Sequence, residues 1–126
     1  MLFDTTLGNA ILSLVSTAID AGSAAGDIQF ATSADYTTIL ATMELNYPSF
    51  GSAATKAMAL DVDPVPSTAV LTNGTAAFAR FRDSNGNVIL SNLTVAASGA
   101  NINFSGGVSW FSGGVVYFNS FELTVP

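Results

Sequence analysis

The sequence of 126 residues contains neither cysteine nor histidine. Without cysteine, the chain can form no disulfide, no thiolate metal site and no cysteine nucleophile. Without histidine, it lacks the commonest transition-metal ligand and the usual general base at neutral pH. We therefore predict a protein that is not an enzyme and that binds no cofactor or metal ion.

Charge is scarce as well, since only 10% of the residues are charged, against roughly 25% in an average soluble domain. Nine acidic residues outnumber the three basic ones, Lys56, Arg80 and Arg82, which gives a net charge of −6. So few basic side chains predict no direct binding of nucleic acid. With 49% hydrophobic residues, an isolated monomer would be poorly covered by charge, so we expect burial against other chains, as in a homo-oligomer.

Long apolar runs are absent too. No window approaches the roughly 20 apolar residues that a membrane-spanning helix needs, so we predict no membrane partner. The first twenty residues have no basic segment, and Asp4 stands where a signal peptide would carry positive charge. A cleaved signal peptide is therefore disfavoured.

What the sequence does contain begins with one helix, predicted from about Asp4 to Ala21. Asp4 or Thr5 can cap its N-terminus, and Gly22 can end it in a left-handed conformation. Since no second helix is predicted, its apolar side must pack on a sheet or dock on a neighbour. That side is an apolar stripe at helical spacing, formed by Leu7, Ile11, Leu14, Val15, Ala18 and Ile19.

The strongest local pattern is a β-hairpin within residues 74–95. Two runs rich in β-branched and aromatic residues flank the turn formers of residues 83–87, Asp-Ser-Asn-Gly-Asn. On the first arm, alternation places Phe81 on one face and Arg80 and Arg82 on the other. These arginines need carboxylate partners, and Glu122 or an acid of a neighbouring subunit is the expected one.

The rest of the chain predicts further short strands separated by turns. Tyr117 and Phe121 share one face of the last strand, and Val116 and Phe118 lie on the other. The pattern predicts a single mostly β domain over 1–126, with the helix at about 4–21 and the β part at about 27–125. We expect an antiparallel sandwich or a barrel-like, jelly-roll-like architecture. The other expected strands cover residues 27–32, 37–46, 54–62, 101–104, 108–111 and 115–125.

Three groups of residues are candidate sites. Asp61 and Asp63 could hold a hard cation, although solvated loop carboxylates are the favoured interpretation. Residues 83–87 begin like a calcium loop, but its glycine and its twelfth residue, Thr94, do not fit that pattern. In the aromatic end of the chain, an exposed row could stack on sugar rings or fill pockets on a protein partner, although core packing is the favoured interpretation. This aromatic end comprises Trp110, Phe111, Tyr117 and Phe118.

The layout also resembles a family of small β-rich proteins encoded among the structural genes of tailed bacteriophages and prophages. The segments that carry the resemblance are TLGNAILSLVSTAIDAG, DIQF, AFARFRDSNGNVILSNLTV, SGANINF and VVYFNSFELTVP, and the Arg-Phe-Arg-Asp-Ser-x-Gly hairpin is among the most specific. The resemblance implies a virion structural protein, assembled in the bacterial cytoplasm, most simply a capsid cement or decoration protein. A neck or tail protein is the related alternative, and a carbohydrate-binding or adhesin β-module is an alternative of another class.

The implied partners are the major capsid protein or other virion proteins, together with copies of the chain itself in a homotrimer. The residues expected at such interfaces are Leu7, Ile11, Arg80, Arg82, Trp110, Phe111, Tyr117 and Phe118.

Overall fold

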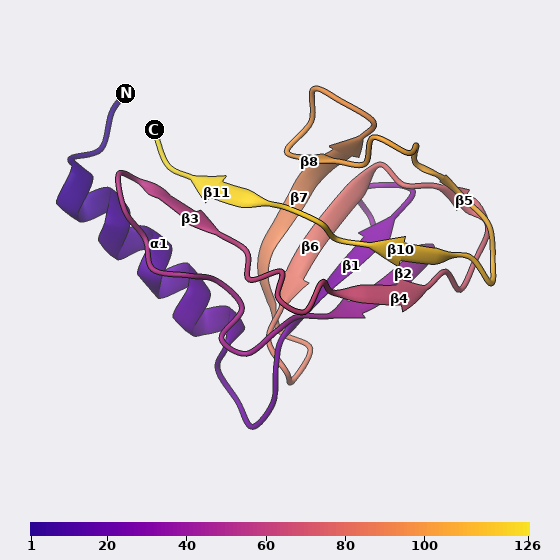
Figure 1. Ribbon diagram of the computed structural model, residues 1–126, viewed down its shortest axis with the longest axis horizontal. Coiled ribbons are helices and arrows are strands. Elements are labelled where there is room, and N and C mark those ends of the chain that lie inside the picture. The colour runs from indigo at the N-terminus through magenta and orange to yellow at the C-terminus, as the bar shows by residue number, and fades with distance from the viewer.

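The computed structural model describes residues 1–126 and contains one helix and eleven short strands (Figure 1). The chain is mostly β with an N-terminal helix, so the predicted fold class is confirmed. The elements are α1 (Thr5–Ile19), β1 (Asp27–Ala31), β2 (Ile39–Glu44), β3 (Ala57–Ala59), β4 (Ser67–Ala69), β5 (Gly74–Thr75), β6 (Phe78–Arg82), β7 (Val88–Ala96), β8 (Ile102–Asn103), β9 (Ser109–Trp110), β10 (Val115–Tyr117) and β11 (Glu122–Thr124).

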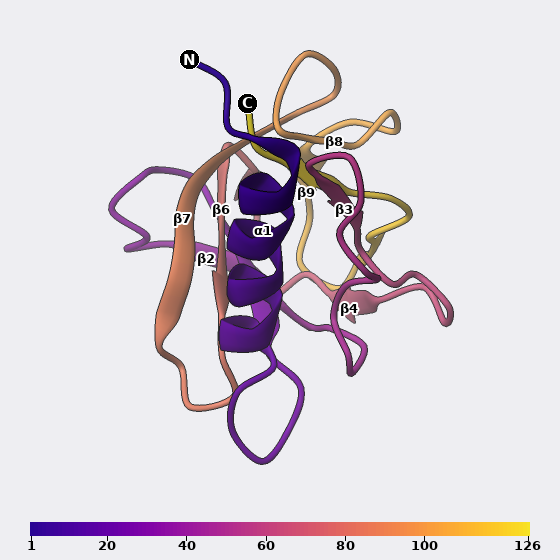
Figure 2. The ribbon, with the colours of Figure 1, turned by 90° about the vertical axis from the view of Figure 1, so that its left-hand side faces the viewer.

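A five-stranded sheet in the order β2-β1-β6-β7-β8 forms one layer. All its neighbours are antiparallel except β7 and β8, which run parallel. The remaining strands form three two-stranded antiparallel ladders, β10–β4, β11–β3 and β5–β9. Figures 1 and 2 show these ladders on one side of the main sheet, so the molecule is layered like a sandwich.

The core between the layers is a cluster of 22 buried residues that is rich in aromatic rings. Phe30 of β1 is fully buried and makes edge-to-face contacts with Trp110 and Phe118, at centroid distances of 5.3 and 6.0 Å. Phe81 of β6 contacts Phe121 at 5.6 Å. These contacts fasten the C-terminal ladders to the main sheet, since such pairs add to the free energy of area burial.

Helix α1 packs beside β7 and β3 (Figure 2). As predicted, Asp4 caps it by accepting hydrogen bonds from the N–H groups of Thr6 and Leu7, at 3.1 and 3.3 Å. The predicted buried stripe is only partly correct, because Leu7 and Leu14 are 51% and 70% exposed. The buried helix residues are Gly8, Leu12 and Ile19.

Gly8 explains why the helix buries a different side from the one that its apolar stripe predicts. A Cβ atom at this position would lie 2.6 Å from Cγ of Lys56 and 2.9 Å from Cγ2 of Val125. A glycine in mid-helix costs roughly 1 kcal/mol of helix propensity relative to alanine, yet only glycine permits this close approach. The helix therefore turns its glycine side to β3 and β11, and part of its apolar stripe is left at the surface.

The expected strand over residues 54–62 is mostly wrong, since only β3 forms there. Thr55 and Lys56 both have left-handed backbone conformations, with φ of 49° and 60°. Two such residues in succession turn the chain, and Ala54 bridges directly to Ala57. The local alternation of apolar residues gave no indication of this turn.

The expected last strand over residues 115–125 is divided into β10 and β11. The predicted faces hold for β10, where Val116 is buried and Tyr117 is exposed. Phe121 does not share a face with Tyr117, because it is buried against Phe118 and Phe81. The irregular Asn119–Ser120 segment shifts the alternation, so Phe118 and Phe121, on either side of it, both point inward.

Candidate functional site

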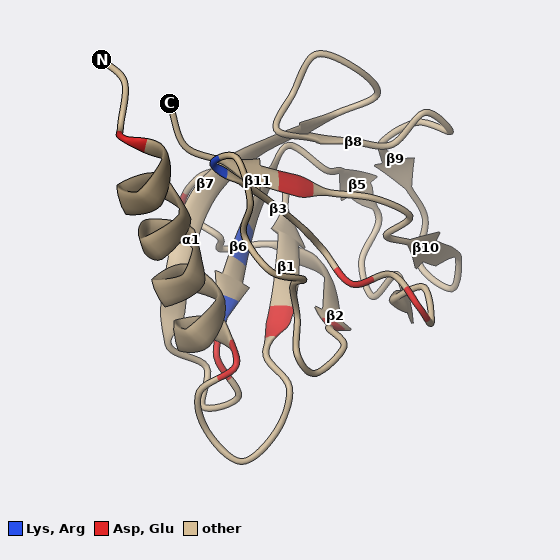
Figure 3. Cartoon of the chain, turned by 60° about the vertical axis from the view of Figure 1, so that its left-hand side comes forward, with Lys and Arg blue, Asp and Glu red and all other residues tan.

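A groove of about 640 Å³ opens at the end of the molecule formed by β9, β10 and the turn at residues 105–107. Its volume lies within the roughly 300–1,000 Å³ typical of small-ligand sites. None of its 16 lining residues is charged, and the ribbon of β9 and β10 is tan in Figure 3. Strand β10, which lines the groove, and α1 lie on opposite sides of the ribbon (Figure 1).

The inner wall of the groove is rigid. Trp110 is 8% exposed and packs edge-to-face on Phe104 and Phe30, at centroid distances of 5.2 and 5.3 Å. Its indole N–H donates a hydrogen bond to the carbonyl oxygen of Gly107 at 3.2 Å. Contacts on several sides therefore hold this ring in one orientation.

The rim of the groove carries exposed aromatic rings. Phe111 follows Trp110 directly and is 70% exposed, while Tyr117 at the end of β10 is 55% exposed. Alternation along an extended chain explains both positions, because Trp110 and Val116 point into the core and their neighbours point out. The structure thus shows which rings of the predicted aromatic end reach solvent.

Phe118 and Trp110 need a correction as interface residues. Phe118 is 1% exposed and packs in the core, so it offers no side chain to a partner of the folded chain. Trp110 is 8% exposed, so little of its side chain is available to a partner. Phe111 and Tyr117 are the aromatic residues accessible to a ligand or another protein.

Polar side chains complete the groove lining. The side chains of Ser105, Ser109, Asn119 and Ser120 line it and make no hydrogen bond within the chain. Asn103 differs, because its amide already bonds both backbone groups of Ala100. Sequence reasoning missed these residues, since isolated serine and asparagine residues in turns have no distinctive spacing.

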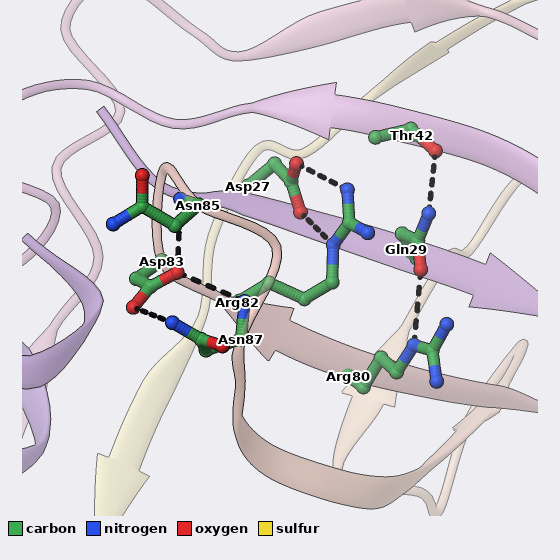
Figure 4. Close-up of polar contacts among 8 residues, drawn as sticks. All are labelled: Asp27, Gln29, Thr42, Arg80, Arg82, Asp83, Asn85 and Asn87. Atoms are coloured by element: carbon green, nitrogen blue, oxygen red, sulfur yellow. Dashed lines mark hydrogen bonds and ion pairs between the residues drawn. The ribbon is translucent and has the colours of Figure 1, made fainter. Parts of the chain in front are cut away.

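The outer face of the main sheet carries a polar ladder (Figure 4). Arg82 donates two hydrogen bonds to the carboxylate of Asp27, at 2.7 and 2.8 Å. Arg80 donates to Gln29 at 2.9 Å. The expected partner Glu122 is wrong, because it lies in the separate β11–β3 ladder, while Asp27 faces Arg82 across the β1–β6 pairing.

These contacts occupy both arginines within the chain. The bidentate hydrogen bond to Asp27 raises the pKa of Arg82 above its usual value. The guanidinium carbon of Arg80 lies 4.4 Å from the centre of the Tyr36 ring. Lys56, the third cation, donates from Nζ to the carbonyl oxygen of Phe3 at 2.8 Å.

Tyr36 is buried beneath this ladder. Its hydroxyl donates to the carbonyl oxygen of Ala79 at 2.8 Å and accepts from the N–H of Asn92 at 3.0 Å. Asn92 has a φ of 60° and lies where the pairing of β6 and β7 is irregular. The Tyr36 hydroxyl therefore pins the two strands at their bulge.

Residues 83–87 form the predicted hairpin turn (Figure 4). The carboxylate of Asp83 accepts from the N–H groups of Asn85 and Asn87 at 2.9 Å each, and from the Asn87 amide at 3.0 Å. The Asn87 side chain is the main reason that the pKa of Asp83 is lowered. The carboxylate is turned toward its own loop, as a turn requires and a calcium loop does not.

Asp61 and Asp63 do not form a cation site. Oδ1 of Asp61 accepts the N–H of Asp63 at 3.1 Å, which is an ordinary loop contact. No group of three or more His, Cys, Asp or Glu side chains in residues 1–126 could hold a metal ion.

The outward side of α1 is the second notable surface. Residues 5–19 contain no charged side chain, and α1 shows no blue or red between its ends in Figure 3. Leu7 and Leu14 are exposed on this side, and Met1 and Leu2 at the N-terminus are 94% and 83% exposed. Ile11, also expected at an interface, is half-buried between the outward side and the core.

Comparisons with protein-family models, with curated proteins and with solved structures found no match to this chain. The structure contains no helix with the length and apolar character needed to cross a membrane.

Proposed function

We propose that this chain is a structural protein of a tailed-phage particle, most simply a capsid cement protein. It associates with copies of itself, as a trimer, and with the surrounding virion proteins through uncharged apolar surface. The observation that carries this proposal is the outward side of α1, where a helix of 15 residues without charge leaves Leu7 and Leu14 exposed. An isolated protein gains nothing from such a surface, whereas an assembled one buries it.

The basic residues support the same proposal. Each of the three cations already bonds within the chain, through Asp27, Gln29 or the carbonyl oxygen of Phe3. Long-range attraction to a polyanion such as DNA needs available positive charge. Association through apolar contact is therefore the mode that this surface favours.

The resemblance of the hairpin and C-terminal segments to small phage structural proteins gives the proposal its biological setting. In that setting, added interface area between capsid subunits would resist the pressure of packaged DNA. Closed symmetry such as that of a trimer would let one protein bridge several capsid subunits at once.

The direct test is the composition of purified particles. We expect the chain to copurify with particles of a phage that encodes it, in fixed ratio to the major capsid protein, as measured by quantitative mass spectrometry. Tail-less heads separate the alternatives, because a cement protein stays with them and a tail protein does not. Absence of the chain from all particle fractions would overturn the proposal.

A pair of helix variants tests the surface itself. Leu14→Glu places a charge on the apolar outward side, and Ser13→Glu places the same charge on the exposed neighbouring position. We expect Leu14→Glu to reduce the oligomer to monomers in light scattering after size exclusion, while Ser13→Glu leaves it assembled. Equal assembly of both variants would show that the helix is not the interface.

A further inference from the structure

The groove at β9 and β10 has a composition that the assembly surface of α1 lacks. Aromatic rings and uncharged hydrogen-bonding groups line the same cavity, in a chain whose net charge is −6. We propose that this groove is a binding site for a neutral saccharide. The inference does not depend on the proposed virion role, because no residue of α1 lines the groove.

The absence of charge selects the class of ligand. An anionic ligand would need a cation in the lining, and all three cations of the chain are engaged elsewhere. A cationic ligand would need a carboxylate, and none lines the groove. Burying an unpaired ligand charge against uncharged walls is costly, so a neutral ligand is the complementary one.

The mixture of surfaces selects among neutral ligands. A pyranose ring presents C–H groups on its faces and hydroxyl groups around its edge, so it needs aromatic planes together with donors and acceptors. Phe111 and Tyr117 supply exposed rings at the rim. Ser105, Ser109, Asn119 and Ser120 supply hydroxyl and amide groups that have no partner within the chain. A purely apolar ligand would leave these polar groups dry and unpaired.

The part of the groove wall formed by Trp110 is already ordered before a ligand binds. Trp110 is fixed by Phe104, Phe30 and the hydrogen bond to Gly107, so little side-chain freedom is lost there on binding. Binding would change the surroundings of this indole, which belongs to the only tryptophan of the chain.

The single tryptophan makes the experiment direct. Its fluorescence is followed in the intact protein during titration with three neutral hexasaccharides, maltohexaose, cellohexaose and hexa-N-acetylchitohexaose. Hyaluronan and oligogalacturonate fragments of similar length serve as anionic controls. We expect a saturable change with at least one neutral hexasaccharide and none with the anionic fragments.

Variants then locate the site. Phe111→Ala and Tyr117→Ala each remove an exposed ring, and we expect each to weaken binding roughly tenfold. Tyr47→Ala removes an equally exposed aromatic ring outside the groove and should bind as the unaltered protein does. Trp110→Ala is unsuitable, because it removes a core residue.

Gly106 offers a blocking variant that keeps the fold. A Cβ atom there meets nothing within 4 Å, and the residue lines the groove. Gly106→Leu should abolish saccharide binding, with the unfolding temperature and oligomeric state unchanged. The proposal is overturned if no neutral hexasaccharide binds at millimolar concentration, if only anionic fragments bind, or if binding survives in Gly106→Leu and in both aromatic variants.

Discussion

The β6–β7 hairpin and the C-terminal segment of residues 102–120 are held by different interactions. In the hairpin, strands of five and nine residues pair directly, and Asp83 stabilises the turn through hydrogen bonds to Asn85 and Asn87. In the C-terminal segment, strands of two or three residues rest on aromatic rings from distant parts of the chain.

This difference has a functional consequence. Where backbone pairing and side-chain ladders hold the structure, polar side chains are occupied, as Arg80 and Arg82 are. Where aromatic packing beneath the surface holds the structure, polar side chains such as Asn119 remain available. The same change in the means of stabilisation therefore separates the part whose polar side chains are occupied from the part suited to recognition.

The largest expected effect comes from the residue that joins the two regions. Phe30→Ala removes a fully buried ring that contacts Phe104, Trp110 and Phe118. We expect the free energy of unfolding to fall by about 3–5 kcal/mol, measured by guanidinium denaturation. Phe111→Ala is the control, since its ring is exposed and its loss should change stability by less than about 0.5 kcal/mol. Similar losses in the two variants would contradict the packing described.

A smaller effect is expected from the Tyr36 hydroxyl, which forms a clamp by bonding both strands of the hairpin. Tyr36→Phe keeps the ring and leaves the carbonyl of Ala79 and the N–H of Asn92 without their partner. The expected loss is about 1–3 kcal/mol in the same denaturation experiment. Tyr47→Phe, which alters an exposed tyrosine, should be neutral, and an equally neutral Tyr36→Phe would refute the clamp.

The ion pair on the outer face is expected to contribute less. Asp27→Asn removes the charge opposite Arg82, where both side chains are about one-fifth exposed, so the loss should be about 1 kcal/mol or less. The difference from the unaltered protein should shrink in 1 M salt, which screens charge. Glu122→Gln, which alters an exposed carboxylate in the separate β11–β3 ladder, is the control and should show neither effect.

The smallest effect should be visible only as a dependence on pH. Because the pKa of Asp83 is lowered in the folded chain, its carboxylate stabilises the fold above the unfolded-state pKa of about 3.9. That stabilisation is lost as the pH falls through the lower folded-state value. The difference in unfolding temperature between Asp83→Asn and the unaltered protein should therefore be constant above about pH 5. In stronger acid, this difference should become smaller. In Asn85→Ser, the matched neutral change in the same turn, the difference should not vary with pH.

The comparison of regions also explains what sequence reasoning could predict. The hairpin, its turn and the Asp4 cap follow from neighbouring residues, so the sequence alone predicted them correctly. The burial of Leu12 in place of Leu14 depends on the contact of Gly8 with Lys56 and Val125, which are far away in the chain. No periodicity within a helix contains that information.

The candidate site was predictable in part for the same reason. Composition drew attention to the aromatic end, and alternation placed Tyr117 opposite Val116. The burial of Trp110 depends on its contact with Phe30, which is distant in the sequence. The groove depends on how several short strands meet, and no local pattern of residues contains that information. Predicting the partner of Arg82 would have required knowledge of the register of β1 against β6.

The placement of the three cations has a practical consequence for proteolysis. Trypsin cuts only after lysine or arginine, and here those bonds lie at the start of β3, inside β6 and at the C-terminal end of β6, which is paired on both sides by β1 and β7. A protease must have its target strand unpaired and extended before it can cut. Cleavage after Arg80 should therefore report the opening of the main sheet, and a folded preparation should remain intact at this bond where a protein rich in surface lysine would be trimmed.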